Sequence, residues 1–135
     1  MISYRSGFKY QLAATYVIPL GTYPKAPIDT EYLQIAADGV LTIKEGFAWD
    51  GPSGPTIDTK NFMRGSLVHD ALYQLMREGH LDHDTYRADA DGILRRIIQE
   101  DGMSWLRAWY VYRGVRLGAG PAADPANDKP ILTAP

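Results

Sequence analysis

A segment dense in glycine and proline divides this chain into two parts of different character, and it limits the possible folds more than any other feature. Residues 46–59 read GFAWDGPSGPTIDT. Proline fixes φ and removes a backbone donor, and glycine weakens regular structure, so this segment cannot be a helix or a central strand. The segment predicts a loop, and loops held by a rigid scaffold often carry binding groups.

The part of the chain before this loop has the character of β-structure. Prolines and glycines between residues 19 and 27 indicate a connection, and Asp38-Gly39 is typical of a tight turn between two strands. The remaining pattern alternates or is rich in β-branched and aromatic residues, which favours strands. Four segments have this strand pattern: residues 8–12, 15–18, 31–35 and 40–43. We expect a small antiparallel sheet.

The part after the loop has helical periodicity. Apolar residues recur at helical spacing, and Asp82 or Asp84 can cap the second helix while Gly102 ends it. The predicted helices are residues 61–77, 85–100 and 105–117. The sequence therefore predicts an α+β fold with one domain over residues 1–117. Its parts are a β-rich stretch (1–45), a metal-type loop (46–60) and a helical part (61–117), followed by a flexible tail (118–135).

Composition agrees with one ordinary globular domain. The chain has 135 residues, of which 45% are hydrophobic and 22% charged, enough for a single modest core. The net charge of −2 supplies no basic field, so we expect no nucleic-acid partner. The absence of cysteine excludes disulfides and thiolate metal sites. We find neither a signal-peptide pattern at the start nor the roughly 20 apolar residues needed to span a bilayer, and we expect synthesis in the cytoplasm.

A candidate site combines residues of the first two predicted helices. His69 and Tyr73 lie one turn apart at the margin of an apolar stripe, and Asp91 has a comparable position on the second helix, one turn after Arg87. If the two helices pack antiparallel, the histidine could meet a carboxylate. Periodicity alone allows Asp89 as well as Asp91 to be that carboxylate. Such a pair fixes the imidazole tautomer and leaves one nitrogen free to take a proton from water.

Oxygen donors accompany this pair. Asp70 follows the histidine directly, and Asp50 lies in the glycine- and proline-rich loop, whose carbonyls are free to turn inward. Carboxylates together with loop carbonyls suit calcium better than zinc. Asp50 could equally be a turn-forming residue with no ligand role.

Three motifs in this order resemble a known family. Residues 69–73, HDALY, resemble the His-Asp-x-x-Tyr helix of phospholipases A2. Residues 87–91, RADAD, resemble the Arg-x-x-x-Asp of the second helix in the prokaryotic branch, and residues 49–52, WDGP, stand where that branch has its loop aspartate. The same order marks an uncharacterised family common in bacteriophages and prophages, which this chain resembles more closely. The resemblance covers residues 46–97.

The resemblance implies a role for each matching residue. His69 would be the base, Asp91 its orienting partner, and Tyr73 the donor of a second hydrogen bond to Asp91. Phe47 and Trp49, near the mouth of the loop, are candidates for contact with lipid. The ligands that the resemblance implies for a calcium ion are Asp50, Asp70 and the carbonyl of Gly51.

The function expected from this resemblance is calcium-dependent hydrolysis of phospholipid or a related acyl ester by a phage-encoded protein made in the host cytoplasm. The alternative is a non-enzymatic protein of the phage tail or lysis machinery, with other virion proteins as partners. A metal-assisted peptidoglycan hydrolase fits less well, because the histidines are few. The missing disulfides and signal peptide, and the added N-terminal sheet, depart from secreted phospholipases.

Two further clusters have competing interpretations. His80 and His83, with Asp82 and Asp84, could bind zinc, although helix caps in a polar turn explain them more simply. The third predicted helix could form a membrane-interface surface, but a core helix with a solvated basic face is the favoured interpretation. The residues concerned are Trp105, Arg107, Trp109, Tyr110, Tyr112, Arg113 and Arg116.

Overall fold

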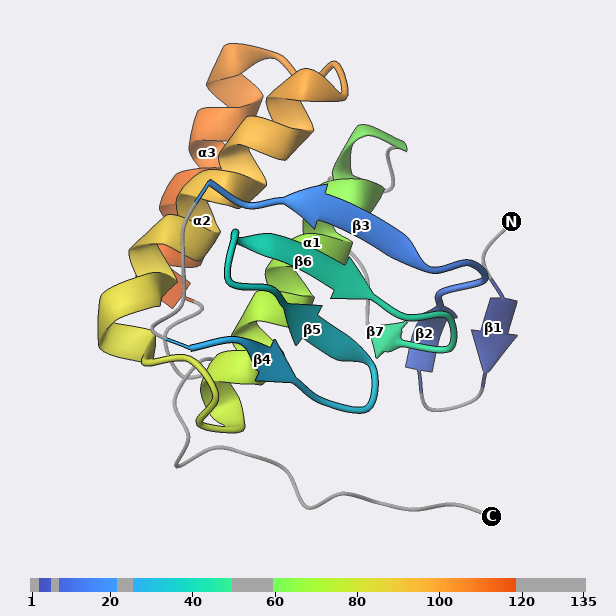
Figure 1. The fold of residues 1–135 in the computed structure, drawn as a ribbon. Helices are drawn as coiled ribbons and strands as arrows, with labels where there is room; N and C mark the ends of the chain where they lie inside the picture. The colour runs from blue at the N-terminus through green and yellow to red at the C-terminus, as the bar shows by residue number, and fades with distance from the viewer. Residues whose placement is uncertain (1–2, 6–7, 22–25, 50–59, 119–135) are drawn as a thin grey trace.

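The computed structural model describes residues 3–5, 8–21, 26–49 and 60–118, and within them the chain folds as strands followed by three helices (Figure 1). This confirms the α+β fold, with antiparallel strands first and helices after them. Most of the predicted loop, including Asp50 and Gly51, lies outside the described residues. The predicted tail also lies outside them, apart from Gly118.

The strands form two antiparallel sheets, where we expected one. The first has the order β1-β2-β7 and the second β3-β6-β5-β4. The strands are β1 (Ser3–Arg5), β2 (Phe8–Gln11), β3 (Tyr16–Pro19), β4 (Ile28–Asp29), β5 (Leu33–Ile35), β6 (Val40–Ile43) and β7 (Ala48–Trp49). The sequence did not predict β1, β4 and β7, because two or three residues carry too little pattern and their pairing depends on distant partners.

The short strand β7 matters for the site because it fixes the start of the glycine- and proline-rich segment. Ala48 and Trp49 pair with β2, and Leu12 N–H donates to the Phe47 carbonyl at 2.8 Å. Phe47 and Trp49 are 2% and 4% exposed. These two residues anchor the chain in the core immediately before the segment that leads to the first helix.

The three helices lie close to their predicted positions: α1 (Lys60–Arg77), α2 (His83–Glu100) and α3 (Trp105–Gly118). Asp82 is the N-cap of α2, and its carboxylate accepts a hydrogen bond from Thr85 N–H. Gly102 follows α2 with φ 104°, a conformation that favours glycine. Local periodicity and capping residues were therefore sufficient to place the helices.

Helices α1 and α2 pack closely against each other and carry the candidate site. Gly65 permits this approach, since a Cβ on it would lie 2.6 Å from a methyl group of Ile98 and 2.9 Å from one of Leu94. Arg64 of α1 contacts Asp101 just after the end of α2, so the start of α1 meets the end of α2. The two helices are thus antiparallel, as the candidate site requires.

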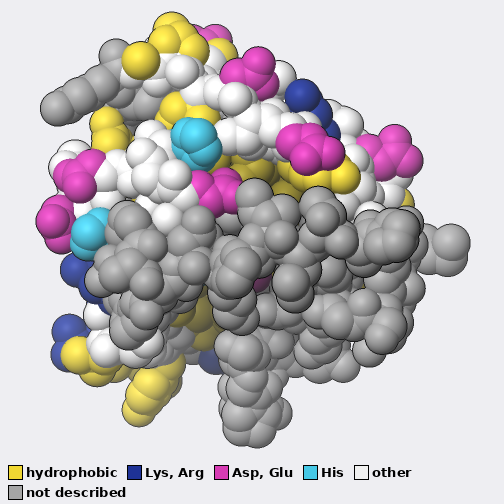
Figure 2. Space-filling model, turned by 90° about the horizontal axis from the view of Figure 1, so that it is seen from below, with side chains coloured by type: hydrophobic (Ala, Val, Ile, Leu, Met, Phe, Trp, Pro, Cys, Tyr) yellow, Lys and Arg dark blue, Asp and Glu magenta, His cyan; other side chains and the backbone are white. Residues whose placement is uncertain are grey.

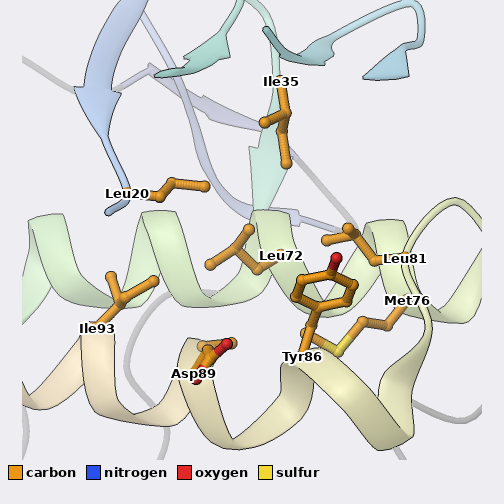
Figure 3. A pocket seen from close by; sticks show the side chains of 9 residues that line it. Leu20, Ile35, Leu72, Met76, Leu81, Tyr86, Asp89 and Ile93 are labelled. Atoms are coloured by element: carbon orange, nitrogen blue, oxygen red, sulfur yellow. The ribbon is translucent and has the colours of Figure 1, made fainter. Parts of the chain in front are cut away.

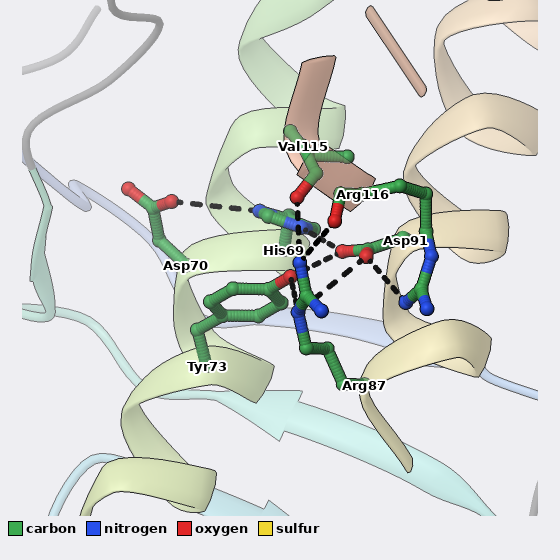
Figure 4. A network of polar contacts seen from close by, with 7 residues as sticks. All are labelled: His69, Asp70, Tyr73, Arg87, Asp91, Val115 and Arg116. Atoms are coloured by element: carbon green, nitrogen blue, oxygen red, sulfur yellow. Dashed lines mark hydrogen bonds and ion pairs between the residues drawn. The ribbon is translucent and has the colours of Figure 1, made fainter. Parts of the chain in front are cut away.

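Helix α3 covers the side of α1 and α2 that faces away from the sheets (Figures 1 and 4). Ala108 is its one buried residue, and Val111 and Val115 pack partly against the cluster formed with Phe62 and Leu94. The favoured interpretation of α3 as a core helix with a solvated basic face is therefore right only in part: one face packs against this cluster, but most of its large apolar side chains face solvent. Among the described residues, no helix is long and apolar enough to cross a bilayer.

Candidate functional site

The site centres on a contact between a histidine of α1 and a carboxylate of α2 (Figure 4). His69 Nε2 lies 2.7 Å from Asp91 Oδ1. Asp91 is fully buried and His69 is 6% exposed. The antiparallel packing of α1 and α2 therefore brings His69 and Asp91 together. The sequence was compatible with this pair but did not require it.

Asp89, the alternative partner, points away from this pair. It lines an apolar pocket on the face of α2 nearer the four-stranded sheet, beside Tyr86 and Ile93 (Figure 3). The other residues of this pocket are Leu20, Ile35, Leu72, Met76, Leu81 and Ala90. Two residues along a helix turn by about 200°, so Asp89 and Asp91 cannot share one face.

Further hydrogen bonds use both oxygens of Asp91. Tyr73 Oη donates to Oδ1 at 2.5 Å, and its ring centroid lies 4.1 Å from that of His69. Arg116 Nη1 of α3 donates to Oδ2 at 3.0 Å. A buried carboxylate requires such partners, because an uncompensated charge in the interior is costly.

Arg116 was not recognised from the sequence as a partner of Asp91. Arg87, one turn before Asp91, was the arginine that the motif indicated, but its Nε lies 4.0 Å from Asp91 Oδ2. The side chain of Arg87 instead donates to Tyr73 Oη at 3.2 Å and to the carbonyls of Val115 and Arg116 at 2.9 and 2.7 Å. These carbonyls belong to the last turn of α3, whose C=O groups lack helical partners. Arg87 thus fixes the end of α3 beside the site.

The charges of the site shift three pKa values. Burial of Asp91 opposes ionisation, but hydrogen bonds from His69, Tyr73 and Arg116 outweigh it and hold the Asp91 pKa below its ordinary value. Burial lowers the pKa of His69, whereas Asp70 and Asp91 raise it, and the net direction is upward. Burial and the neighbouring Asp91 raise the pKa of the Tyr73 hydroxyl. Tyr73 therefore stays protonated as a donor, and Asp91 is an anion.

Asp70 lies on the other side of the imidazole. Its Oδ1 is 3.9 Å from His69 Nδ1, and its side chain is 37% exposed. Asp50 and Gly51, the other predicted ligands, lie outside the described residues. Of the three predicted ligands, Asp70 is thus the one that the described residues include. It lies beside Nδ1 of His69, the nitrogen that does not contact Asp91.

The residues predicted to contact lipid at the loop mouth are in the core. Trp49 Nε1 donates to Ser66 Oγ at 3.2 Å, and the indole packs 5.5 Å from the ring of Tyr10. Phe47 belongs to the same core cluster. Neither side chain offers surface to a lipid, and their burial favours a role in anchoring the segment that follows.

An exposed cluster lies at the turn between α1 and α2, where Figure 2 shows histidine and acidic side chains on one face. Asp82, His83 and Asp84 bring potential metal-binding atoms within 4.8 Å of one another. Asp82 is occupied as the N-cap of α2, and His83 Nε2 lies 3.3 Å from Asp84 Oδ1. Capping and a local ion pair account for this cluster without zinc.

Comparison with protein families places this site in a known group of sequences. Residues 26–115, more than half of the chain, match the model of a family described as "Protein of unknown function (DUF1353)". The chain belongs to this family. The DUF1353 match contains His69, Asp70, Tyr73 and Asp91, and it ends one residue before Arg116. No curated protein and no solved structure matches the chain.

Proposed function

We propose that this DUF1353 protein is a calcium-dependent, phospholipase A2-like hydrolase of acyl esters that activates water through His69. The proposal rests on one arrangement: the Nε2 side of the imidazole contacts Asp91, and Nδ1 lies on the side of the partly exposed Asp70. A buried carboxylate holds one imidazole nitrogen in place and leaves the other as the acceptor, which is what a positioned general base requires.

The proton transfers follow from this geometry. Nε2–H donates to Asp91, so Nδ1 is the acceptor in neutral His69. Nδ1 takes a proton from water while the water oxygen attacks the acyl carbonyl, and the imidazolium then gives that proton to the leaving alcohol oxygen. Asp91 stabilises the imidazolium, while Tyr73 and Arg116 keep Asp91 in place. The products are a carboxylic acid and an alcohol, and no covalent enzyme intermediate is needed.

A calcium ion fits the donor chemistry present. The Asp70 carboxylate is a hard oxygen ligand, which calcium prefers, and the proposal takes Asp50 and the Gly51 carbonyl as its other ligands. When bound, calcium would offset the negative charge that raises the His69 pKa and supply an electrophile for the acyl carbonyl oxygen.

A second candidate function is a non-enzymatic role in a phage tail or lysis complex. The observation that favours it is burial: His69 is 6% exposed, Asp91 is fully buried, and side chains of α1 and α3 hold both carboxylate oxygens of Asp91. A network that joins three helices in this way could serve the fold alone.

The experiment that separates the two roles is acyl-ester release from mixed phospholipid vesicles with calcium and with chelator. His69→Gln should lower the rate by about a hundredfold or more, the loss expected when a positioned general base is removed. His80→Gln changes an exposed histidine near the end of α1 and should leave the rate unchanged. Asp91→Asn should act more mildly than His69→Gln. Absence of turnover on vesicles, monomeric lipids and short-chain esters would leave the structural role.

A further inference from the structure

Helix α3 presents apolar side chains on both of its long faces. The inner face packs through Ala108, Val111 and Val115. On the opposite face, spacings of three and four residues align Leu106, Tyr110, Arg113 and Leu117 in one stripe. Leu106, Tyr110 and Leu117 are 57%, 66% and 78% exposed. Because α3 already packs through its opposite face, this exposed and largely apolar stripe indicates a docking surface.

The aromatic side chains of α3 extend this surface. Trp105 is 62% and Trp109 37% exposed, and both precede stripe residues in the sequence. Trp109 packs edge-on against Tyr110, with ring centroids 5.6 Å apart. From the side shown in Figure 2, hydrophobic side chains stand beside basic ones at the lower left edge, where α3 lies. We call the stripe residues Leu106, Tyr110, Arg113 and Leu117, together with Trp105 and Trp109, the α3 outer face.

The charge of α3 has one sign. Its sequence, WLRAWYVYRGVRLG, contains three arginines and no acidic residue, in a chain whose net charge is −2. Arg113 lies within the stripe, with its guanidinium 5.9 Å from the Trp109 ring centroid. A second copy of the chain that met this stripe through its own α3 outer face would oppose it with the same positive charge. The partner of the outer face should therefore be negatively charged as well as apolar.

We propose that the α3 outer face docks on an anionic phospholipid surface. Tryptophan and tyrosine favour the boundary between headgroups and acyl chains, and leucine enters the apolar region below it. Arginine extends its apolar stem along such a surface and binds phosphate with its guanidinium. A projecting convex helix suits a bilayer, because a bilayer needs no matching groove.

The outer face shares the last turn of α3 with residues that contact the candidate site. Leu117 follows Arg116, which donates to Asp91, and Arg87 holds the carbonyls of Val115 and Arg116. Docking through α3 would thus leave the buried His69–Asp91 pair beneath the docked helix, on the side where α3 packs against α1 and α2. A link between this docking and catalysis rests on the proposed hydrolase function, whereas the docking itself does not.

Vesicle co-sedimentation and tryptophan fluorescence of the full chain test the docking in the presence of chelator. We expect binding to vesicles of phosphatidylcholine with phosphatidylglycerol, a blue shift of the tryptophan emission, and much weaker binding to phosphatidylcholine alone. The double variant Leu106→Glu, Tyr110→Glu should weaken binding at least about tenfold, because it places two negative charges in the stripe. Arg113→Gln should weaken it by about fivefold, the contribution typical of one cation near an anionic leaflet.

The matched control is Val17→Glu, which adds a charge at an exposed apolar residue of β3 and should bind like wild type. Circular dichroism must show that each variant is folded. Failure of the wild type to bind anionic vesicles, equal weakening by Val17→Glu, or self-association that the Leu106→Glu, Tyr110→Glu variant abolishes would each overturn the docking. His69→Gln should bind like wild type. Wild-type binding without ester hydrolysis would support the docking and contradict the proposed activity.

Discussion

Arg116 of α3 donates to Oδ2 of Asp91 at 3.0 Å, while His69 and Tyr73 of α1 contact Oδ1 of the same carboxylate. One buried anion thus joins all three helices. Helix α3 has few buried residues of its own, so this polar contact should contribute substantially to holding it against α1 and α2.

The first prediction is that removal of the Arg116 guanidinium destabilises the fold. Arg116→Gln leaves Asp91 Oδ2 without its nearest cation. We expect the free energy of unfolding to fall by about 1–2 kcal/mol. This is the lower part of the range for charged hydrogen bonds, because the Arg116 side chain is 31% exposed. Arg113→Gln is the control on the same helix and should change stability by less than about 0.5 kcal/mol. Urea denaturation measures both. Equal effects of the two substitutions would contradict a specific role for Arg116.

The second prediction concerns two glycines in the paired helices. Gly65→Ala should destabilise by about 1–3 kcal/mol, because the new methyl group would overlap Ile98 and Leu94 where α1 and α2 meet. Gly92→Ala should stabilise by up to about 1 kcal/mol, since a Cβ there meets no atom within 4 Å and alanine favours a helix. Thermal denaturation of both variants checks the opposite signs. A neutral Gly65→Ala would mean that the helices are not this closely packed.

The helices were predictable because their signals are local. Periodicity and the two candidate caps Asp82 and Asp84 placed α2 within two residues of its observed start, and the structure selects Asp82 as the cap. The two sheets were less predictable, because strands such as β4 and β7 form only by hydrogen bonding to segments distant in sequence.

The candidate site was predictable only in part, because only some of its contacts are local in sequence. The spacing of His69 and Tyr73 is local, but the choice between Asp89 and Asp91 depends on how α2 is rotated in the packed structure. Arg116 is 25 residues from Asp91 and has no motif that links the two. Helix α3 has apolar side chains on two opposite faces, so periodicity could not identify the exposed one.

The third prediction is that part of the stability depends on pH through Asp91. Because its pKa in the folded protein is lower than in the unfolded chain, the ionised carboxylate favours folding. This contribution is present above roughly pH 4 and is lost as the pH falls through the folded pKa. Asp91→Asn should therefore cost about 2–3 kcal/mol at neutral pH and progressively less in acid.

Urea denaturation of wild type and Asp91→Asn at a series of pH values measures this difference directly. Asp89→Asn changes an exposed carboxylate on the same helix and should show no comparable loss. A difference between wild type and Asp91→Asn that stays constant down to pH 2 would show that Asp91 is not the group responsible.

The last prediction addresses the proposed calcium ion through stability, independently of catalysis. A ligand that binds only the folded protein stabilises it by RT ln(1 + [L]/Kd), about 2.7 kcal/mol at a hundredfold excess over Kd. Thermal denaturation should shift upward with millimolar calcium, and Asp70→Asn or Asp50→Asn should remove most of the shift. Magnesium should substitute poorly, because it demands tighter octahedral geometry and releases water reluctantly. Asp84→Asn, in the exposed cluster at the start of α2, should leave the shift intact. A shift abolished by Asp84→Asn rather than Asp70→Asn would place the ion at that cluster, and no shift at all would remove calcium from the proposed mechanism.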